Sequence, residues 1–260
     1  MEIENIAAEA MAGKYSFLAP GLVLRIAAEE APKYKKDKDR IKAVKKQLHI
    51  FCGAFENDNC HREAEQILGS LNKGEFLGRE RLEKLCLLHA STRERLPDME
   101  EFYAFLSSSL GNPESIIDVG CGFAPFCAEL LPSVKEYRAS DIDARSIGLI
   151  GKYLELSGLK GSAYPLDAVS QTPEGCADAA FMFKLFPVLE AQKKGRGFEL
   201  MRELKVKRIA LSFPIRSLGG RDKGMESFYS EKFEGGLPEG FEIKDKKVIG
   251  TELVYILEKK

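Results

Sequence analysis

The sequence predicts an α/β protein in which a doubly wound, mostly parallel sheet follows an all-helical N-terminal region. The first observation is the apolar, β-prone run 115–119, which stops at Gly120 and Gly122 and continues with helical spacing. The second is that strand-like and helix-like stretches alternate from there onward. The third is a pair of late strand-like runs joined at Gly250, which predicts a closing antiparallel hairpin. Together these observations predict a Rossmann-like domain.

Apolar periodicity places the individual elements. We expect strands near 115–119, 136–141, 162–166, 178–183, 207–213, 241–249 and 251–258, and a helix near 225–234. Before about residue 105 the apolar spacing is helical throughout. We therefore expect two domains, an all-helical domain over 1–105 and an α/β domain over 106–260.

Composition and charge exclude several classes of protein. The 260 residues carry 39 Lys and Arg against 40 Asp and Glu, so any attraction to nucleic acid must come from local patches. No apolar run reaches membrane length, and the start of the chain lacks the basic residues of a signal peptide. The six cysteines form no C-x-x-C pair and are typical of reduced thiols. We therefore expect a cytoplasmic protein that does not bind a membrane.

The turn after the first strand allows close approach of a ligand, because Gly120 and Gly122 lack an obstructing Cβ. Asp141 ends the next strand at the spacing where an acid accepts hydrogen bonds from a ribose. A turn that uses glycine for geometry alone is one alternative. A dinucleotide fingerprint is another, although Pro125 replaces its third glycine. The D-x-G-x-G pattern from Asp118 is similar instead to the S-adenosylmethionine signature of class I methyltransferases, which implies that fold and that cofactor.

A second acid follows the third strand. Asp167 ends that strand, and ligands in such sheets bind at the carboxyl ends of the strands. We therefore expect Asp141 and Asp167 to lie beside each other, one on a ribose and the other on an adenine amino group. The alternative for Asp167 is a loop aspartate that caps the following helix.

The exit from the fourth strand discriminates between methyl acceptors. Lys184 is out of place at a buried strand end, so we expect its side chain to face the cleft. Enzymes that methylate exocyclic amines usually have an Asn/Asp-Pro-Pro-aromatic tetrapeptide here, which is absent, and the chain has no Pro-Cys dipeptide for cytosine C5 chemistry. Guanine N7 carries an unprotonated lone pair at neutral pH, so its methylation needs alignment rather than a general base.

Two basic stretches are candidates for contact with phosphates. One is the stretch 33–48, where Ile41, Val44 and Leu48 recur at helical spacing and form a single apolar stripe, while the other faces of the helix are densely positive. The common alternative for such a charge run is a solvated helix face. The other is a Gly-rich loop after the fifth strand, unusually long and basic for a mere connection. The residues that we expect to bind RNA are Lys35, Lys36, Arg40, Arg216 and Arg221.

Several motifs spread over most of the chain carry a family resemblance. They are His89-Ala90-Ser91-Thr92-Arg93-Glu94-Arg95-Leu96, Phe183-Lys184-Leu185, Ser212-Phe213-Pro214, Arg216-Ser217-Leu218-Gly219-Gly220-Arg221, Lys223-Gly224-Met225-Glu226 and Gly250-Thr251-Glu252-Leu253. In these motifs the chain resembles the aminoglycoside-resistance 16S rRNA methyltransferases of the Arm and FmrO type. The resemblance implies methyl transfer from S-adenosylmethionine to guanine N7 in helix 44 of the 30S subunit, with resistance to drugs such as gentamicin and kanamycin.

The resemblance also implies roles for individual residues. The cofactor would be held by Phe51, His89, Ala90, Ser91, Arg95, Gly120, Asp141, Asp167, Ala168, Phe183 and Gln192. For the methionyl end we expect Arg95 rather than Arg93 to supply the cation. Lys184 and Glu226 resemble positions near the target base and are the catalytic candidates. The N-terminal domain of a monomeric protein would dock on the rRNA.

Two other functions stay open at this point. A methyltransferase for a small molecule would leave the basic helix and the arginine loop unexplained. A non-catalytic rRNA-binding factor with a vestigial fold is disfavoured by the intact Gly120, Asp141 and Asp167. A zinc site is not expected, because the spacing of His49, Cys52, Cys60 and His61 matches no standard pattern.

Overall fold

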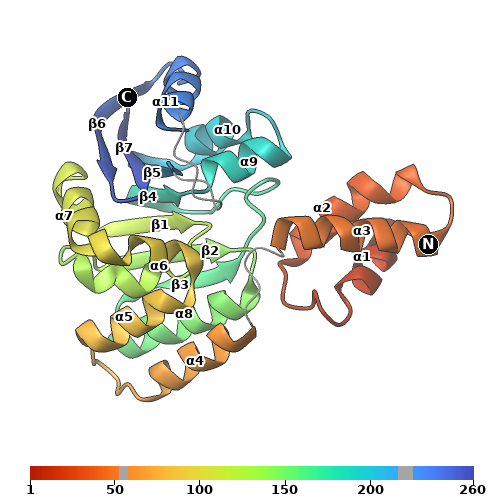
Figure 1. Cartoon of the computed structure of the whole chain (residues 1–260), viewed down its shortest axis with the longest axis horizontal. Helices are drawn as coiled ribbons and strands as arrows, with labels where there is room; N and C mark the ends of the chain where they lie inside the picture. Colours follow the sequence, from red (N-terminus) through yellow and green to blue (C-terminus); the bar gives the residue numbers. More distant parts are fainter. Residues whose placement is uncertain (53–57, 216–224) are drawn as a thin grey trace.

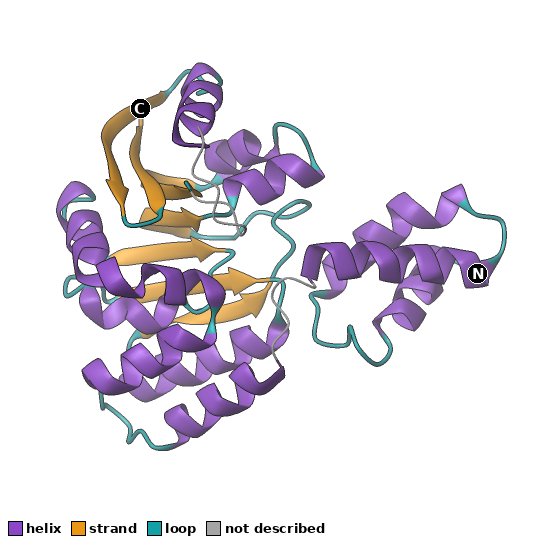
Figure 2. Cartoon of the chain, in the orientation of Figure 1, coloured by secondary structure: helices purple, strands orange, loops and turns teal. Residues whose placement is uncertain are grey.

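A seven-stranded sheet wrapped by helices and a small helical bundle beside it make up the structure (Figure 1). The computed structural model describes residues 1–52, 58–215 and 225–260, apart from the side chains of residues 51, 52, 58 and 225–228. Figure 2 shows the arrowheads of the central strands pointing toward the bundle, so the bundle lies at the carboxyl edge of the sheet. Among the described helices none is long and apolar enough to cross a bilayer.

The sheet has the strand order β3-β2-β1-β4-β5-β7-β6. Its strands are β1 Ser115–Val119, β2 Glu136–Asp141, β3 Lys160–Pro165, β4 Cys176–Phe183, β5 Lys205–Pro214, β6 Phe241–Ile249 and β7 Glu252–Lys259. The first five are parallel, and β7 runs antiparallel to both β5 and β6. All seven expected strands are confirmed, and β3, β4 and β5 each begin two residues earlier than expected. This is the class I methyltransferase fold that the sequence predicts.

Helices cover both faces of the sheet, as a parallel sheet requires. One face is covered by α4 Asp58–Gly69, α5 Gly78–Leu88, α7 Met99–Ser109, the 3-10 helix η3 Ala124–Leu130 and α8 Ala144–Ser157. The other is covered by α9 Phe186–Gln192, α10 Arg196–Glu203 and α11 Met225–Gly235. The short α6 Ala90–Arg95 and the 3-10 helix η2 Leu96–Asp98 connect α5 to α7. The segment after the glycine turn is thus a 3-10 helix rather than a longer α-helix, with Pro125 in its first turn and its residues 124–128 all buried.

The N-terminal bundle has a core of its own. It consists of α1 Ile3–Met11, α2 Pro20–Glu30, the 3-10 helix η1 Ala31–Lys33 and α3 Asp37–Cys52. The apolar stripe expected on α3 is present, since Val44 and Leu48 are fully buried in this core. Helices α4, α5 and α7 belong instead to the core of the sheet. We therefore infer a domain boundary near residue 52, earlier than the expected 105, because helical spacing does not say which core a helix is buried in.

Candidate active site

The glycine turn after β1 and the acid that ends β2 are held together by backbone hydrogen bonds. The N–H groups of Gly120 and Cys121 donate to the Ser140 carbonyl at 2.8 and 3.0 Å. Gly120 and Gly122 have φ values of +66° and +49°, which favour glycine. A Cβ at Gly122 would lie 2.7 Å from Cε1 of His89. The turn is therefore closed against the segment before α6, where His89 also stacks on a buried phenylalanine, Phe123.

Asp141 is oriented by this turn. Its Oδ2 accepts from the Gly122 N–H at 2.9 Å, and its Oδ1 accepts from the Asp143 N–H at 3.1 Å. Burial raises the pKa of Asp141, and these two donors oppose the rise. A carboxylate has about four acceptor positions, so capacity remains for a hydroxyl group of a ligand. Asp143, which follows, caps α8 by accepting from the N–H groups of Arg145 and Ser146.

A second buried acid lies beneath the same turn. The Asp118 side chain accepts a hydrogen bond from the Tyr137 hydroxyl at 2.7 Å, and its Oδ1 has no partner among the described residues. Burial raises the pKa of Asp118 to about 7, with the Tyr137 hydrogen bond opposing the rise.

Asp167 is held by groups from three parts of the chain. Its own loop supplies the Val169 N–H at 3.2 Å and the Ser170 hydroxyl at 2.8 Å. No helix lies in the fully described stretch between β3 and β4 for Asp167 to cap, so the capping alternative is wrong. Arg25 of α2 donates from Nε at 2.6 Å and from Nη2 at 3.3 Å. The Asp167 side chain is 2% exposed. Sequence reasoning missed Arg25, because nothing in the pattern of α2 shows that it faces a loop 142 residues away.

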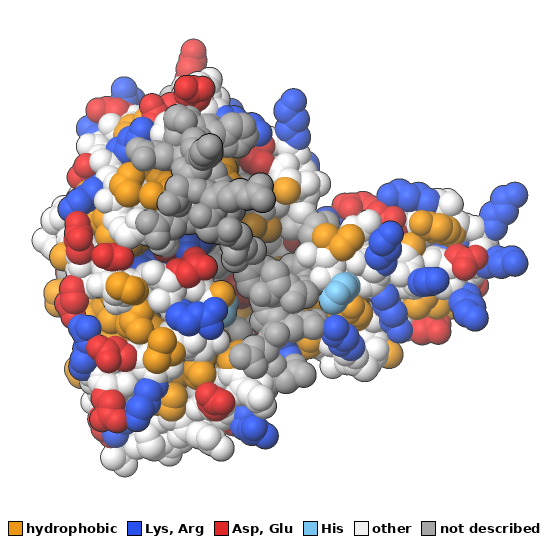
Figure 3. Space-filling model, in the orientation of Figure 1, with side chains coloured by type: hydrophobic (Ala, Val, Ile, Leu, Met, Phe, Trp, Pro, Cys, Tyr) orange, Lys and Arg blue, Asp and Glu red, His pale blue; other side chains and the backbone are white. Residues whose placement is uncertain are grey.

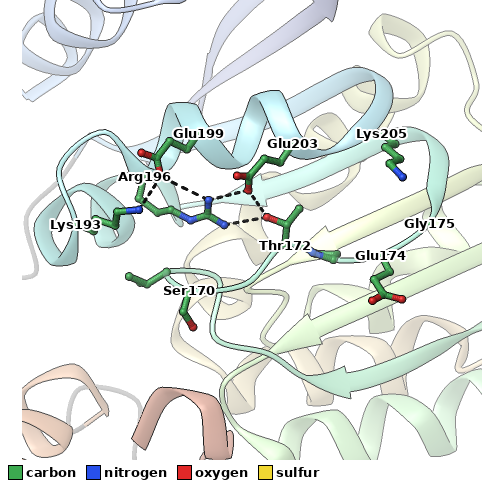
Figure 4. A pocket seen from close by; sticks show the side chains of 11 residues that line it. Ser170, Thr172, Glu174, Gly175, Lys193, Arg196, Glu199, Glu203 and Lys205 are labelled. Carbon is green, nitrogen blue, oxygen red and sulfur yellow. Dashed lines mark hydrogen bonds and ion pairs between the residues drawn. The ribbon is translucent and has the colours of Figure 1, made fainter. Parts of the chain in front are cut away.

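The loop of Asp167 is also fixed from α10, as Figure 4 shows. Arg196 is buried and donates to the carbonyls of Ala168 and Gln171, each at 2.8 Å. Its Nη1 pairs with Glu203 at 2.8 Å, and Lys193 pairs with Glu199 nearby at 2.8 Å. Four of the charged side chains that line the hollow in this figure thus pair with one another, and Arg196 among them holds the loop of Asp167.

A charged cluster lies where β4, β5 and β7 meet. Glu252 begins β7 and accepts from Nε and Nη2 of Arg95, both at 3.0 Å, and from the Ser212 hydroxyl at 2.5 Å. Burial opposes ionisation of Glu252, but Arg95 and then Lys184 outweigh it and keep the pKa of Glu252 below its usual range. Sequence reasoning assigned no role to Glu252. The signal that was available is an acid at the start of an otherwise apolar strand.

Arg95 presents one further donor. Its guanidinium lies 4.1 Å from the ring centre of Phe102 and 4.8 Å from that of Phe183. Its Nη1 is buried and has no hydrogen-bond partner in the part of the chain that the structure describes. Arg93, in contrast, is exposed. A buried guanidinium nitrogen without a partner is costly, which indicates an anionic ligand at this point.

Lys184 adopts an unusual backbone conformation at the end of β4. Its φ is +55°, held by hydrogen bonds from its N–H to the Ser212 carbonyl at 3.0 Å and to the Ser212 hydroxyl at 3.2 Å. Such a conformation costs about 1–3 kcal/mol in a residue other than glycine and is typical of functional sites. The Lys184 ammonium lies 2.6 Å from Glu94 and 3.4 Å from Glu252.

Cations of α3 and of the two residues before it form a basic surface on the bundle, called the basic surface of α3 below, and blue side chains are visible on the bundle in Figure 3. Lys35 and Lys36 are exposed, and neither has an ion pair within the described ranges. Arg40 is half-buried and donates to the Tyr34 carbonyl at 2.9 Å and to Asp37 at 3.0 Å. Further along the helix, Lys38, Lys42 and Lys46 are exposed.

Comparison with known proteins identifies the family. The chain matches the family of ribosomal RNA methyltransferases named FmrO over residues 12–256. It belongs to this family. It is 36% identical over 246 residues to the 16S rRNA (guanine(1405)-N(7))-methyltransferase of Serratia marcescens, covering 95% of this chain and 94% of that one. The corresponding protein of Micromonospora echinospora is 32% identical, with 95% and 92% covered.

Solved structures agree with this assignment. The crystal structure of the 16S rRNA methyltransferase RmtF in complex with S-adenosyl-L-homocysteine superposes with a TM-score of 0.88 at 34% identity, with all of both chains covered. The 16S rRNA methylase RmtB superposes with a TM-score of 0.86 at 31% identity, covering 100% of this chain and 99% of that one. This member of the FmrO family therefore has the fold of its relatives over its whole length.

The fold of this FmrO-family chain brings most of the expected site residues to one edge of the sheet. Those placed there are His89, Ala90, Ser91, Arg95, Gly120, Asp141, Asp167, Ala168, Phe183, Lys184 and Gln192. Four expected residues lie outside the described part of the structure, either entirely or in their side chains. They are Phe51, Arg216, Arg221 and Glu226. Across the described ranges, no group of three or more His, Cys, Asp or Glu side chains is arranged to hold a metal.

Proposed function

We propose that this FmrO-family protein is a 16S rRNA (guanine(1405)-N(7))-methyltransferase that uses S-adenosylmethionine on the 30S subunit. The observation that carries the proposal is one edge of the sheet at which two oriented acids, Asp141 and Asp167, accompany the partnerless Nη1 of Arg95. Curated relatives that match 95% of the chain are named for this activity.

The cleft has a group to match each part of S-adenosylmethionine. The Nη1 of Arg95 suits the methionyl carboxylate, beside His89, Ala90, Ser91 and Gly120. The open acceptor positions of Asp141 suit the ribose hydroxyls. Asp167 and Ala168 suit the adenine, with Phe183 and Gln192 near them, and Phe51 is proposed to complete the pocket. When bound, the cofactor supplies an electrophilic methyl group on a sulfonium centre.

The residues of the chain act by placing the base. Guanine N7 has no proton to remove, so a general base is not needed, and catalysis becomes orientation in a cleft that excludes water. We propose that Lys184 and Glu226 lie beside the target base. The strained backbone of Lys184, fixed by Ser212, points its ammonium toward the acids of α6 and β7.

The substrate is proposed to be the decoding site in helix 44, bound by a monomer. Lys35 and Lys36, just before α3, and Arg40 within it lie on the bundle, and Arg216 and Arg221 belong to the loop after β5. Contacts of this kind to phosphates supply affinity and register without reading the sequence of the RNA. A methyl group and a positive charge at N7 would remove an acceptor that gentamicin and kanamycin need, so resistance to these drugs follows.

The test is incubation of unmethylated 30S subunits with the protein and S-adenosylmethionine, followed by mass mapping and primer extension of the 16S rRNA. N7-methylguanosine at position 1405, absent with Asp141→Ala, is the expected result. Methylated small molecules with unaltered rRNA would instead identify a metabolite methyltransferase. Cofactor binding without any methylated product would identify a non-catalytic rRNA-binding factor.

A further inference from the structure

The N-terminal bundle contacts the α/β body at the loops that carry the two acids. The Ala19 N–H donates to the Ile142 carbonyl at 2.8 Å, and the Ala144 N–H donates to the Phe17 carbonyl at 2.8 Å. Residue 18 forms a β-bridge with Asp143. These contacts hold the start of α2 against the loop after β2, next to Asp141. In Figure 1 the bundle accordingly meets the body at the carboxyl edge of the strands.

Arg25 extends this contact to the loop after β3. Its Nε donates to Oδ2 of Asp167 at 2.6 Å, and its Nη2 donates to Oε1 of Gln192 at 2.8 Å and to Oδ1 of Asp167 at 3.3 Å. The side chain of Arg25 is 13% exposed. Its third nitrogen faces outward and pairs with Glu29 at 3.2 Å, whose side chain is 54% exposed. One guanidinium thus joins two side chains that the family resemblance places around adenine.

The two oxygens of Asp167 are not equivalent. Oδ2 accepts two short hydrogen bonds, from Arg25 at 2.6 Å and Ser170 at 2.8 Å. Oδ1 accepts two longer ones, from Arg25 at 3.3 Å and Val169 at 3.2 Å. Oδ1 therefore carries the weaker pair of hydrogen bonds, so it is the oxygen at which a donor from a ligand would replace an existing one. Arg25 also supplies the positive charge that pairs with this nearly buried carboxyl group.

We propose that Arg25 is a positioning residue for the adenine end of the cofactor. The bundle, through this guanidinium, keeps the Asp167 carboxyl group turned so that Oδ1 accepts from the 6-amino group of adenine, and it holds Gln192 beside it. The inference rests on the proposed function in one respect, the assignment of Asp167 to adenine. It adds a side chain from a separate helical core to the cofactor site.

The experiment compares two ligands that differ at the 6-position of the purine and in the proton on N1. S-adenosylhomocysteine has a 6-amino donor, whereas S-inosylhomocysteine has a 6-oxo acceptor there, which the acceptor oxygens of Asp167 disfavour. The dissociation constants of both are measured by calorimetry for the wild type, Arg25→Met, Arg25→Lys and the control Glu29→Gln. Circular dichroism and the unfolding temperature of each variant show whether it is folded.

We expect Arg25→Met to bind S-adenosylhomocysteine about ten-fold more weakly, because hydrogen bonds to a charged group are lost. Its affinity for S-inosylhomocysteine should change much less. The preference for adenine, which is the ratio of the two dissociation constants, therefore falls. Arg25→Lys should restore only part of the preference, because an ammonium cannot bridge two side chains as a guanidinium does. Glu29→Gln, which removes an Arg25 ion pair that does not reach the loop, should keep the full preference.

An undiminished preference in Arg25→Met would overturn the inference. An equal loss of affinity for both ligands would also overturn it, since that outcome indicates a purely structural role. Asp167→Ala separates this failure from failure of the cofactor assignment. If Asp167→Ala loses the preference and Arg25→Met keeps it, only the role of Arg25 is wrong. If Asp167→Ala keeps the preference, the assignment of Asp167 to adenine is wrong and the role of Arg25 falls with it.

Discussion

Arg95 and Glu252 form a buried bidentate ion pair, with both hydrogen bonds at 3.0 Å and side-chain exposures of 3% and 2%. The pair uses two of the three guanidinium nitrogens and leaves Nη1 without a partner among the described residues. Glu252 thus fixes the orientation of the planar guanidinium group of Arg95, and this orientation sets the direction in which Nη1 can donate. The arrangement suits a bound carboxylate better than an isolated arginine would, since the geometry exists before the ligand arrives.

The first prediction concerns this pair. Arg95→Met should weaken binding of S-adenosylhomocysteine by more than ten-fold and lower the free energy of unfolding by about 3–5 kcal/mol, because the buried Glu252 loses its bidentate partner. Calorimetry and urea unfolding measure the two effects. Arg93→Met, which changes an exposed arginine of the same helix, is the control and should alter neither. A loss of cofactor affinity in Arg93→Met instead would transfer the carboxylate to that residue.

Asp141 provides the second prediction. Asp141→Ala should abolish measurable cofactor binding, because the ribose loses its acceptor and the Gly122 N–H loses the carboxylate that orients the turn. Asp178→Ala is a matched control, since Asp178 lies at the opposite end of the sheet, where it accepts from the Glu114 and Ser115 N–H groups. Unchanged affinity in Asp141→Ala would remove the ribose assignment.

The basic surface of α3 gives the third prediction. Changing Lys35, Lys36 and Arg40 together to Glu should weaken 30S binding by at least ten-fold at physiological salt and flatten its dependence on salt concentration. Cofactor affinity should stay the same, because these residues lie on the bundle away from the cleft.

The control for that experiment makes the same change of charge at the other edge of the sheet. Lys135, Lys160 and Lys205 are exposed near the starts of β2, β3 and β5, and their replacement by Glu should affect 30S binding much less. Equal losses in the two triple variants would mean that only net charge matters. Undiminished binding in the α3 variant would make that helix an ordinary solvated surface.

Lys184 allows its backbone and its charge to be tested separately. Because φ is +55°, Lys184→Gly should be more stable to unfolding than Lys184→Ala by about 1 kcal/mol. Both variants lose the ammonium and should methylate 30S subunits at least ten-fold more slowly, with little change in cofactor affinity. Single-turnover methylation measures the rate. Full activity in Lys184→Gly would show that the position matters only for its backbone.

Asp118 predicts a specific dependence of stability on pH. Burial raises its folded-state pKa to about 7, above the value of about 4 in an unfolded chain. The folded protein therefore binds this proton more tightly, so the stability contributed by protonated Asp118 is complete below pH 4 and is lost as the pH rises to about 7. Asp118→Asn cannot ionise at this position, so its stability should not show this fall as the pH rises.

The measurement is urea unfolding of the wild type and Asp118→Asn at pH 5 and pH 8. From pH 5 to pH 8, the free energy of unfolding of Asp118→Asn should rise by roughly 2–3 kcal/mol relative to that of the wild type. Parallel pH profiles for the two proteins would show that Asp118 titrates below this range.

The strands, the glycine turn and the acids at the ends of β2 and β3 could all be predicted from the amino-acid sequence. These features depend on local patterns, since apolar runs predict strands and the carboxyl ends of parallel strands lie at one edge of the sheet. The basic face of α3 was visible for the same reason, because helical spacing separates its apolar stripe from its charges.

The distant partners of these residues, in contrast, depend on how the chain folds. Arg25 reaches Asp167 across 142 residues and Arg95 reaches Glu252 across 157, and no local period records such a pairing. The same holds for α4, α5 and α7, whose helical spacing is equally compatible with a separate domain and with the core of the sheet that they join. Local pattern shows that a side chain is buried or charged, but the side chain it meets is set by how the whole chain packs.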